Sequence, residues 1–144
     1  MAIIAAVDGG NGSTRVASTA HELAAGLGTG LVVVHVVTEA EAEDRMDRQT
    51  DYYLDDAVAD AERVAERIAG DVVEGGFSVE AVGKLGEPTE KILEVAEAHD
   101  ADYVVIGGRK RTPIGKALLG SVTQSVHLSS DRPVVTVMEP EPED

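Results

Sequence analysis

The chain of 144 residues contains no cysteine and no tryptophan, and its only aromatic residues are three tyrosines and one phenylalanine. Without cysteine the protein has no disulfide bond, no thiolate metal ligand and no cysteine nucleophile. Hydrophobic residues still make up 43% of the chain, which is enough for a core at this length. The sequence therefore predicts one domain whose core consists of Val, Ile, Leu and Ala.

The sequence also lacks a long apolar run. No stretch reaches the roughly 18 residues that a membrane-spanning helix needs. The first ten residues, MAIIAAVDGG, have no basic segment ahead of their apolar run, which argues against a signal peptide. We therefore expect a soluble, cytoplasmic protein with no membrane partner.

Basic residues are scarce: 12 Lys and Arg face 27 Asp and Glu, and the net charge is −15. This charge repels nucleic-acid backbones and anionic membranes, so neither is expected as a partner. Acidic residues along the whole chain are typical of halophilic proteins, because molar salt shortens the Debye length to roughly 3 Å and screens their repulsion. The alternative is an ordinary acidic protein with an acidic tail. Folding followed by circular dichroism against KCl concentration separates the two.

Apolar runs alternate with helical periodicity along the chain. Five apolar segments predict strands, at 3–7, 31–37, 77–85, 102–108 and 133–138. Four segments with apolar residues three or four positions apart predict helices, at about 13–27, 51–69, 88–99 and 122–130. The acidic stretch 39–47 is interpreted as a solvated loop or a frayed helix start. The acidic residues 139–144 are interpreted as a disordered tail.

This alternation predicts an α/β fold, a parallel, doubly wound sheet with helices on both faces, in a single domain of residues 1–138. The strand at 77–85 alternates in its first half, which suits an edge of the sheet. The strand at 133–138 is apolar and comes last. As an edge strand it would need cover, which a homodimer would supply, whereas as an internal strand it would need none.

Polar residues follow the first strand, where ligands of open parallel sheets bind. Asp8 opens the Gly-rich sequence DGGNGS, and Ser13 is expected to cap the following helix. The carboxylate of Asp8 could accept hydrogen bonds from a sugar hydroxyl or a base amino group. It could equally bond to the backbone of its own turn. Both interpretations remain open from the sequence.

The fourth strand is followed by GGRKRTPIGKALLGS, residues 107–121. Gly107 and Gly120 would let backbone N–H groups approach a phosphate closely. Ser121 and Gln124 form a Ser-x-x-Gln pattern that predicts a capping box at the start of the last helix. A helix N-terminus also suits an anion. The alternative is a helix cap without a ligand.

Positive charge is concentrated in this loop. No Asp or Glu occurs from Tyr103 to Ser130. The same window holds four of the 12 basic residues, Arg109, Lys110, Arg111 and Lys116. A strongly acidic chain with one positive loop is suited to binding an anion, or to holding an acidic surface of its own.

Other chemistry is not indicated by the sequence. The histidines at 21, 35, 99 and 127 have no metal-ligand spacing. His35 lies within an apolar strand and is expected to be a hydrogen-bonded core residue. The chain contains no P-loop, no nucleophile elbow and no complete dinucleotide-binding pattern.

Four segments together resemble the universal stress protein family over nearly the whole chain. They are VDGGNGSTRVA, VVHVV, GEPTEKILEVAEAHDADYVVIGG and GGRKRTPIGKALLGSVTQSVHLSSDRPVVTV. The resemblance implies a five-stranded parallel sheet ordered 3-2-1-4-5, and a homodimer made through the fifth strand at about 133–138. It also implies a protein of the stress response or of signalling.

The ATP-binding branch of this family carries a Gly-x2-Gly-x9-Gly-Ser/Thr pattern. Gly107, Gly120 and Ser121 match it, whereas Lys110 occupies the second glycine position. Its side chain could fill the pocket, or its ammonium could contact a phosphate. The nucleotide contacts that the resemblance implies, together with the basic loop, are Asp8, Val36, Gly107, Arg109, Lys110, Gly120, Ser121 and Val122.

Within this resemblance, Asp8 would contact adenine or ribose, and the backbone of Val36 would contact adenine. Gly107 would lie near the ribose, and Gly120, Ser121 and Val122 would bind phosphates. The implied ligand is ATP or another adenine nucleotide, with Mg²⁺ held mainly by the phosphates. One alternative is a dimeric interaction module that binds no nucleotide and holds an acidic partner with its basic loop. Slow ATP hydrolysis is a third option.

Overall fold

The computed structural model describes residues 1–111 and 116–139, and only the backbone of 109–111 and 116–118. Its strands are β1 (Ala2–Ala6), β2 (Gly30–Val37), β3 (Val79–Leu85), β4 (Ala101–Arg111), β5 (Lys116–Leu118) and β6 (Val134–Glu139). Its helices are α1 (Ser13–Leu27), α2 (Glu39–Arg48), α3 (Leu54–Val72), α4 (Pro88–Ala98) and α5 (Ser121–Ser129).

Five parallel strands form the sheet in the order β3-β2-β1-β4-β6. Counted along the chain, these parallel strands have the predicted order 3-2-1-4-5, so the predicted fold is confirmed. β3 lies at one edge, as its alternating sequence indicates. β6 pairs only with β4 among the described residues, so the last strand is the other edge rather than an internal strand.

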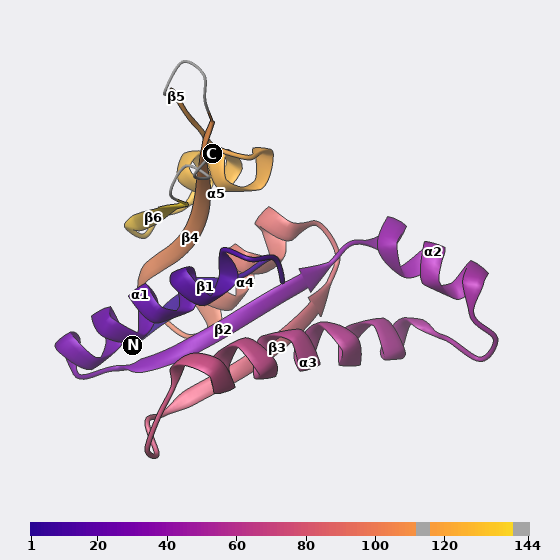
Figure 1. Ribbon diagram of the computed structural model, residues 1–144, viewed down its shortest axis with the longest axis horizontal. Helices are drawn as coiled ribbons and strands as arrows, with labels where there is room; N and C mark the ends of the chain where they lie inside the picture. Colours follow the sequence, from indigo (N-terminus) through magenta and orange to yellow (C-terminus); the bar gives the residue numbers. More distant parts are fainter. Residues whose placement is uncertain (112–115, 140–144) are drawn as a thin grey trace, which may run out of the picture.

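Helices cover both faces of the sheet (Figure 1). On one face, buried residues of β1, β2 and β4 pack against alanine-rich surfaces of α1 and α3. On the other face, the same strands pack against α4 and α5, with Ile92, Val95 and Val126 in the core. Small side chains let the helices approach closely: at Gly83 of β3, a Cβ would lie 2.6 Å from the carbonyl oxygen of Val58 in α3. The core is thus aliphatic, as the composition predicts.

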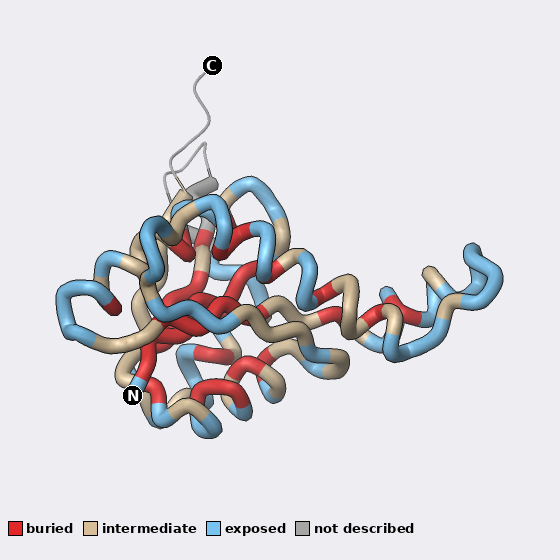
Figure 2. The backbone as a smooth tube through the Cα atoms, turned by 90° about the horizontal axis from the view of Figure 1, so that it is seen from below, coloured by how far each residue is buried: buried red, intermediate tan, exposed pale blue. Residues whose placement is uncertain are grey.

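The acidic stretch 39–47 is a regular helix, α2, and the prediction of a loop or frayed start is wrong. Thr38 is its N-cap, and the Thr38 hydroxyl accepts the Glu41 N–H at 3.1 Å. Acidic residues lie in its first turn, and Arg45 and Arg48 lie in its last turn. These charges interact favourably with the helix dipole and so stabilise the helix. Only Ala42 is buried, so the sequence shows little apolar periodicity here. α2 and the start of α3 project from the sheet as an arm (Figures 1 and 2).

The segment after β4 also differs from the predicted loop. β4 continues to Arg111, and its last three residues pair antiparallel with β5. β6 likewise runs one residue past the predicted strand and includes Glu139, which was assigned to the tail. Residues 140–144 of that tail lie outside the described residues. Among the described helices, none combines the length and hydrophobicity needed to cross a bilayer.

Candidate functional site

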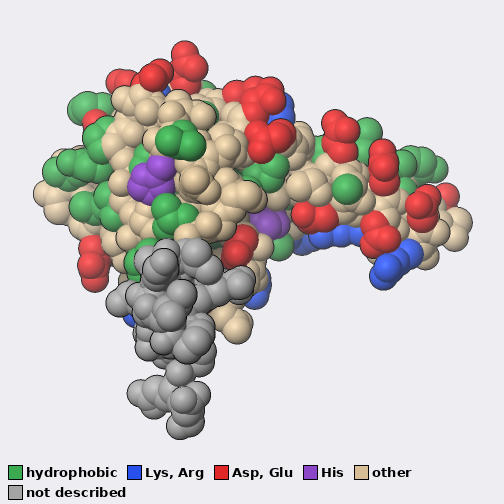
Figure 3. Space-filling view, turned by 90° about the horizontal axis from the view of Figure 1, so that it is seen from above, with side chains coloured by type: hydrophobic (Ala, Val, Ile, Leu, Met, Phe, Trp, Pro, Cys, Tyr) green, Lys and Arg blue, Asp and Glu red, His purple; other side chains and the backbone are tan. Residues whose placement is uncertain are grey.

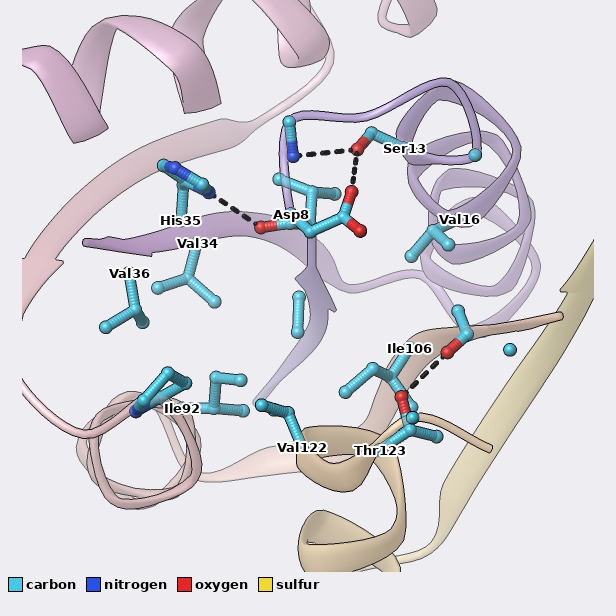
Figure 4. Close-up of a pocket in the computed structure, with 18 of the residues that line it drawn as sticks. Asp8, Ser13, Val16, Val34, His35, Val36, Ile92, Ile106, Val122 and Thr123 are labelled. Atoms are coloured by element: carbon cyan, nitrogen blue, oxygen red, sulfur yellow. Dashed lines mark hydrogen bonds between the residues drawn. The ribbon is translucent and has the colours of Figure 1, made fainter. Parts of the chain in front are cut away.

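A cleft of about 930 Å³ opens beyond the carboxyl ends of β1, β2 and β4 (Figure 4). This is the point where the strand order reverses, because β2 and β3 lie on one side of β1 and β4 and β6 on the other. The volume falls within the range of small-molecule and cofactor sites. Its position is the one that the sequence predicts for a ligand.

The floor of the cleft is apolar. Side chains from two strands and two helices line it together: Val34, Val36, Ile92, Ile106 and Val122. Figure 4 shows them grouped below the Asp8 turn, with Ile92 on α4 and Val122 on α5. Such a surface suits a flat, weakly polar ring.

One wall is the turn between β1 and α1, and side chains hold its shape. Oδ1 of Asp8 accepts the Gly10 N–H at 2.8 Å and the Ser13 hydroxyl at 3.2 Å. The Ser13 oxygen in turn accepts the Gly9 N–H at 3.0 Å. The turn interpretation of Asp8 is therefore confirmed for Oδ1. Asp8 is exposed at the cleft, and its Oδ2 makes no hydrogen bond within the described residues, so this oxygen can meet a ligand.

Two predicted helix caps are wrong by one residue. Gly12, not Ser13, is the N-cap of α1, because the Ser13 hydroxyl is committed to Asp8 and Gly9. Gly120, not Ser121, is the N-cap of α5, and no side chain caps this helix within the described residues. The predicted capping box with Gln124 is therefore absent from the described structure. The first turn of α5 lines the cleft, and no side chain among the described residues caps it.

The opposite wall consists of the end of β4 and the start of α5. The carbonyl of Gly107 accepts the buried hydroxyl of Thr123 at 2.7 Å, which ties the helix to the strand. A Cβ on Gly107 would lie 3.2 Å from Cγ2 of Val16, so any larger residue would be crowded there. Backbone groups, rather than side chains, shape this wall.

His35 forms the back of the first wall. Its Nδ1 lies 2.9 Å from the carbonyl oxygen of Val7, the residue before Asp8. The predicted hydrogen bond of His35 is confirmed, but the residue is half-buried at the cleft rather than enclosed in the core.

Charged side chains line the rim of the cleft. Glu139 packs its side chain against Gly12 at the start of α1, where a Cβ would lie 3.2 Å from Cγ of Glu139. Arg15 and Arg45 contribute positive charge and Glu41 negative charge. Figure 3 shows acidic side chains over the body and the arm, with basic side chains along one side of the arm.

The Arg45 guanidinium is held by a cluster between α2 and α3. Its Nη1 lies 3.4 Å from the Tyr52 hydroxyl and 3.5 Å from Oδ2 of Asp60. The hydrogen bond that Arg45 donates to the Tyr52 hydroxyl raises the pKa of Arg45. Hydrogen bonds from Tyr52 and then Arg63 lower the pKa of Asp60.

The sequence did not predict that Arg45 would lie at the cleft. The Thr38-x-x-Glu41 cap pattern was the signal that a helix begins there.

Six of the eight predicted site residues line the one cleft: Asp8, Val36, Gly107, Gly120, Ser121 and Val122. Arg109 and Lys110 lie in the β4–β5 hairpin, where Lys110 pairs with Ala117, but their side chains are outside the described residues. No group of three or more His, Asp or Glu side chains in the described part of the chain could hold a metal ion.

The fold defines a doubly wound α/β protein with a cleft at the reversal point of its sheet. Residues 1–138 match the model of the Universal stress protein family, and the chain belongs to that family. A universal stress protein of Methanocaldococcus jannaschii is 37% identical to it over 62 residues, which are 43% of this chain and 38% of that relative. The match thus spans about two fifths of the relative's length.

Solved structures share the fold over nearly the full chain. A universal stress protein from Archaeoglobus fulgidus superimposes with a TM-score of 0.72 at 30% identity, covering 94% of this chain and 97% of that one. A structure of the universal stress protein from Archaeoglobus fulgidus in complex with dAMP gives a TM-score of 0.57 at 26% identity. That alignment covers 94% of this chain and 96% of that one.

Proposed function

We propose that the protein binds an adenine nucleotide, ATP foremost, in the cleft, and that occupancy of this site serves as a signal. The observation that carries the proposal is the composition of the cleft: an apolar floor lies between an Asp8 wall and a wall of backbone N–H groups. The apolar floor suits a purine, the carboxylate of Asp8 suits a polar group of the base or of a ribose, and the N–H groups suit a phosphate chain.

In this arrangement the base lies on the floor beside the backbone of Val36, and Asp8 accepts a hydrogen bond from the base or the ribose. The ribose passes Gly107, where the absence of a side chain leaves room. The phosphates meet the N–H groups at Gly120, Ser121 and Val122. Arg109 and Lys110 add positive charge, and Mg²⁺ is held mainly by the phosphates.

The relative that binds dAMP supports this choice of ligand, because it has the same fold at 26% identity. The test is mass spectrometry of small molecules released from the purified protein, followed by calorimetric titration of ATP, ADP and AMP in high KCl. We expect a released adenine nucleotide, or saturable binding after it is stripped. Absence of both contradicts the proposal.

We further propose a homodimer joined through β6. This strand is an edge whose residues are only half-buried in the single chain. The carbonyl of Pro133 accepts the Val104 N–H, so Val134, Thr136 and Met138 present their backbone groups to the free edge. Thr136→Pro removes one outward N–H without breaking a bond to β4, whereas Thr136→Val keeps that N–H. Light scattering should show a monomer for Thr136→Pro and a dimer for both the wild type and Thr136→Val.

The alternative function is an interaction module that binds no nucleotide. The observation that favours it is Glu139, whose side chain lies at the rim of the cleft against the start of α1, where an acidic group is unfavourable for a phosphate. Under this alternative, Arg109→Glu with Arg111→Glu abolishes binding of an acidic partner protein, and neither the wild type nor the variant binds ATP.

A further inference from the structure

The ladder between β1 and β2 stops one hydrogen bond early. The Val7 N–H donates to the Val34 carbonyl at 3.0 Å, just beyond the last paired residues, Ala6 and Val34. In a parallel ladder the next bond would join the Val36 N–H to the Val7 carbonyl. Within the described residues this bond is absent, and the Val7 carbonyl instead meets Nδ1 of His35 at 2.9 Å.

The direction of the Val36 backbone follows from the alternation along β2. The Leu31 N–H donates to Ser78, and the Val37 carbonyl accepts from Gly86, so odd-numbered residues face β3. The Val34 carbonyl faces β1, and Val36 therefore faces the same side. Because β1 has ended at that level, the N–H and C=O of Val36 point into the cleft that this residue lines.

We infer that His35 is a positioning residue that keeps the ligand-facing backbone of Val36 open. Its imidazole satisfies the Val7 carbonyl, so the β1–β2 ladder does not close over the Val36 N–H. This N–H and the neighbouring carbonyl are then available to a ring edge that offers one acceptor and one donor. The identity of that ring as adenine rests on the proposed function, whereas the role of His35 in the ladder does not.

An imidazole suits this task. A carbonyl oxygen only accepts hydrogen bonds, so Nδ1 must carry a proton, which it does in one neutral tautomer and in the charged ring. The ring also lies beside Gly9, which has a φ of +85°: a Cβ there would lie 3.7 Å from Cε1 of His35 and 3.4 Å from Cγ1 of Val64. The ring thus lies next to the turn that carries Asp8 and bonds to the carbonyl of the residue before Asp8.

The test compares His35→Leu, which cannot donate, with His35→Gln, which can. Amide hydrogen exchange is measured on the ligand-free protein by NMR. In His35→Leu the Val7 carbonyl is free to take the Val36 N–H, so exchange at Val36 should slow by about five- to tenfold, the effect of one hydrogen bond. In His35→Gln it should stay near the wild-type rate. The amide of Val34, inside the ladder, should remain protected in all three proteins.

Affinity supplies a second readout, since a closed ladder removes a ligand contact. ATP binding should weaken roughly tenfold in His35→Leu and change little in His35→Gln. A role of His35 in stability alone would lower protection at Val36 rather than raise it.

Two results overturn the inference: a strongly protected Val36 amide in the wild type, or exchange at Val36 that is unchanged or faster in a folded His35→Leu. If that variant does not fold, the tautomer of His35 in the wild type, measured by NMR, still tests the inference. An imidazole protonated only at Nε2 could not donate to the Val7 carbonyl and would contradict it. The exchange experiment uses no nucleotide, so a wild type that binds none contradicts the proposed function alone.

Discussion

The two walls of the cleft are built in different ways. The Asp8 wall is shaped by side chains. Asp8, Ser13 and His35 hold its turn through hydrogen bonds of 2.8 to 3.2 Å. The α5 wall is made by backbone, with Gly120 as an N-cap that offers no side-chain acceptor. The first wall is held by its own hydrogen bonds, while the start of the second has no side-chain cap within the described residues. This asymmetry matches the proposed ligand, in which the base or the ribose meets Asp8 and the phosphates meet the start of α5.

The largest effect is expected at Gly107, in the wall formed by the end of β4 and the start of α5. Gly107→Val would crowd Val16, since even a Cβ lies 3.2 Å from its Cγ2. We expect a loss of about 1–3 kcal/mol in the free energy of unfolding and ATP binding weakened by roughly 100-fold or more. Denaturant melts and calorimetry measure both.

Gly26→Ala is the matched control for this change. Gly26 lies within α1 and a Cβ there meets nothing within 4 Å, so the variant should be as stable as the wild type or slightly more stable. Wild-type affinity in Gly107→Val would mean that the ligand does not pass this point.

Two variants of Asp8 distinguish its role in holding the turn from its role in binding a ligand. Asp8→Asn keeps an oxygen for the Gly10 N–H and the Ser13 hydroxyl, whereas Asp8→Ala removes it. The Ala variant should lose about 1 kcal/mol of stability, and both variants should bind ATP about tenfold more weakly. If Asp8→Asn binds like the wild type, Asp8 is only a turn residue.

Glu139 tests whether a carboxylate at the rim of the cleft weakens the binding of phosphates at the α5 wall. Glu139→Gln removes a negative charge beside Gly12, so ATP affinity should rise by roughly threefold at low salt, where charges are least screened. Adenosine, which has no phosphate, should be unaffected. Glu41→Gln is the control from the arm side of the cleft. An equal gain for adenosine would contradict an electrostatic effect of Glu139 on the phosphates.

The smallest effect is expected far from both walls, at the contact between α4 and β3. Nδ1 of His99 lies 2.9 Å from the Val95 carbonyl, and its Nε2 contacts Glu80. The Val95 carbonyl, and then Glu80, raise the pKa of His99 above its usual value near 6.5.

Because the folded-state pKa is the higher one, this contact stabilises the protein fully below about pH 6.5, and the contribution is lost as pH rises through the folded-state pKa. For a partly exposed pair the loss is at most about 1 kcal/mol. Thermal melts from pH 6 to 8 should show the decline, and His99→Gln should remove it without changing ATP affinity. An equal decline in the variant contradicts this assignment.

The sheet and most of the cleft could be predicted because they follow from local patterns. Apolar runs located the parallel strands, and the carboxyl ends of β1 and β4 brought Asp8 and Gly107 together as expected. What the patterns missed depends on other interactions. α2 is stabilised by its Thr38 cap and charge distribution rather than by an apolar face. The β4–β5 pairing joins backbone groups of basic residues, which hydrophobic periodicity does not report.

The errors at the helix starts have a shared cause. At both Ser13 and Ser121 a glycine precedes the serine and takes the N-cap position, which places the serine inside the helix. At Ser13 the contact with Asp8, five residues apart, explains why the hydroxyl is used elsewhere. Glu139 was assigned to the tail by composition, but its backbone pairs with Arg109 of β4.

The most direct test of the account is calorimetric titration of ATP into protein stripped of bound small molecules, in high KCl, for the wild type and Asp8→Asn. The account predicts saturable binding with one site per chain in the wild type, and about tenfold weaker binding in the variant. No heat of binding in the wild type, with no nucleotide in the material released from it, would contradict the central claim.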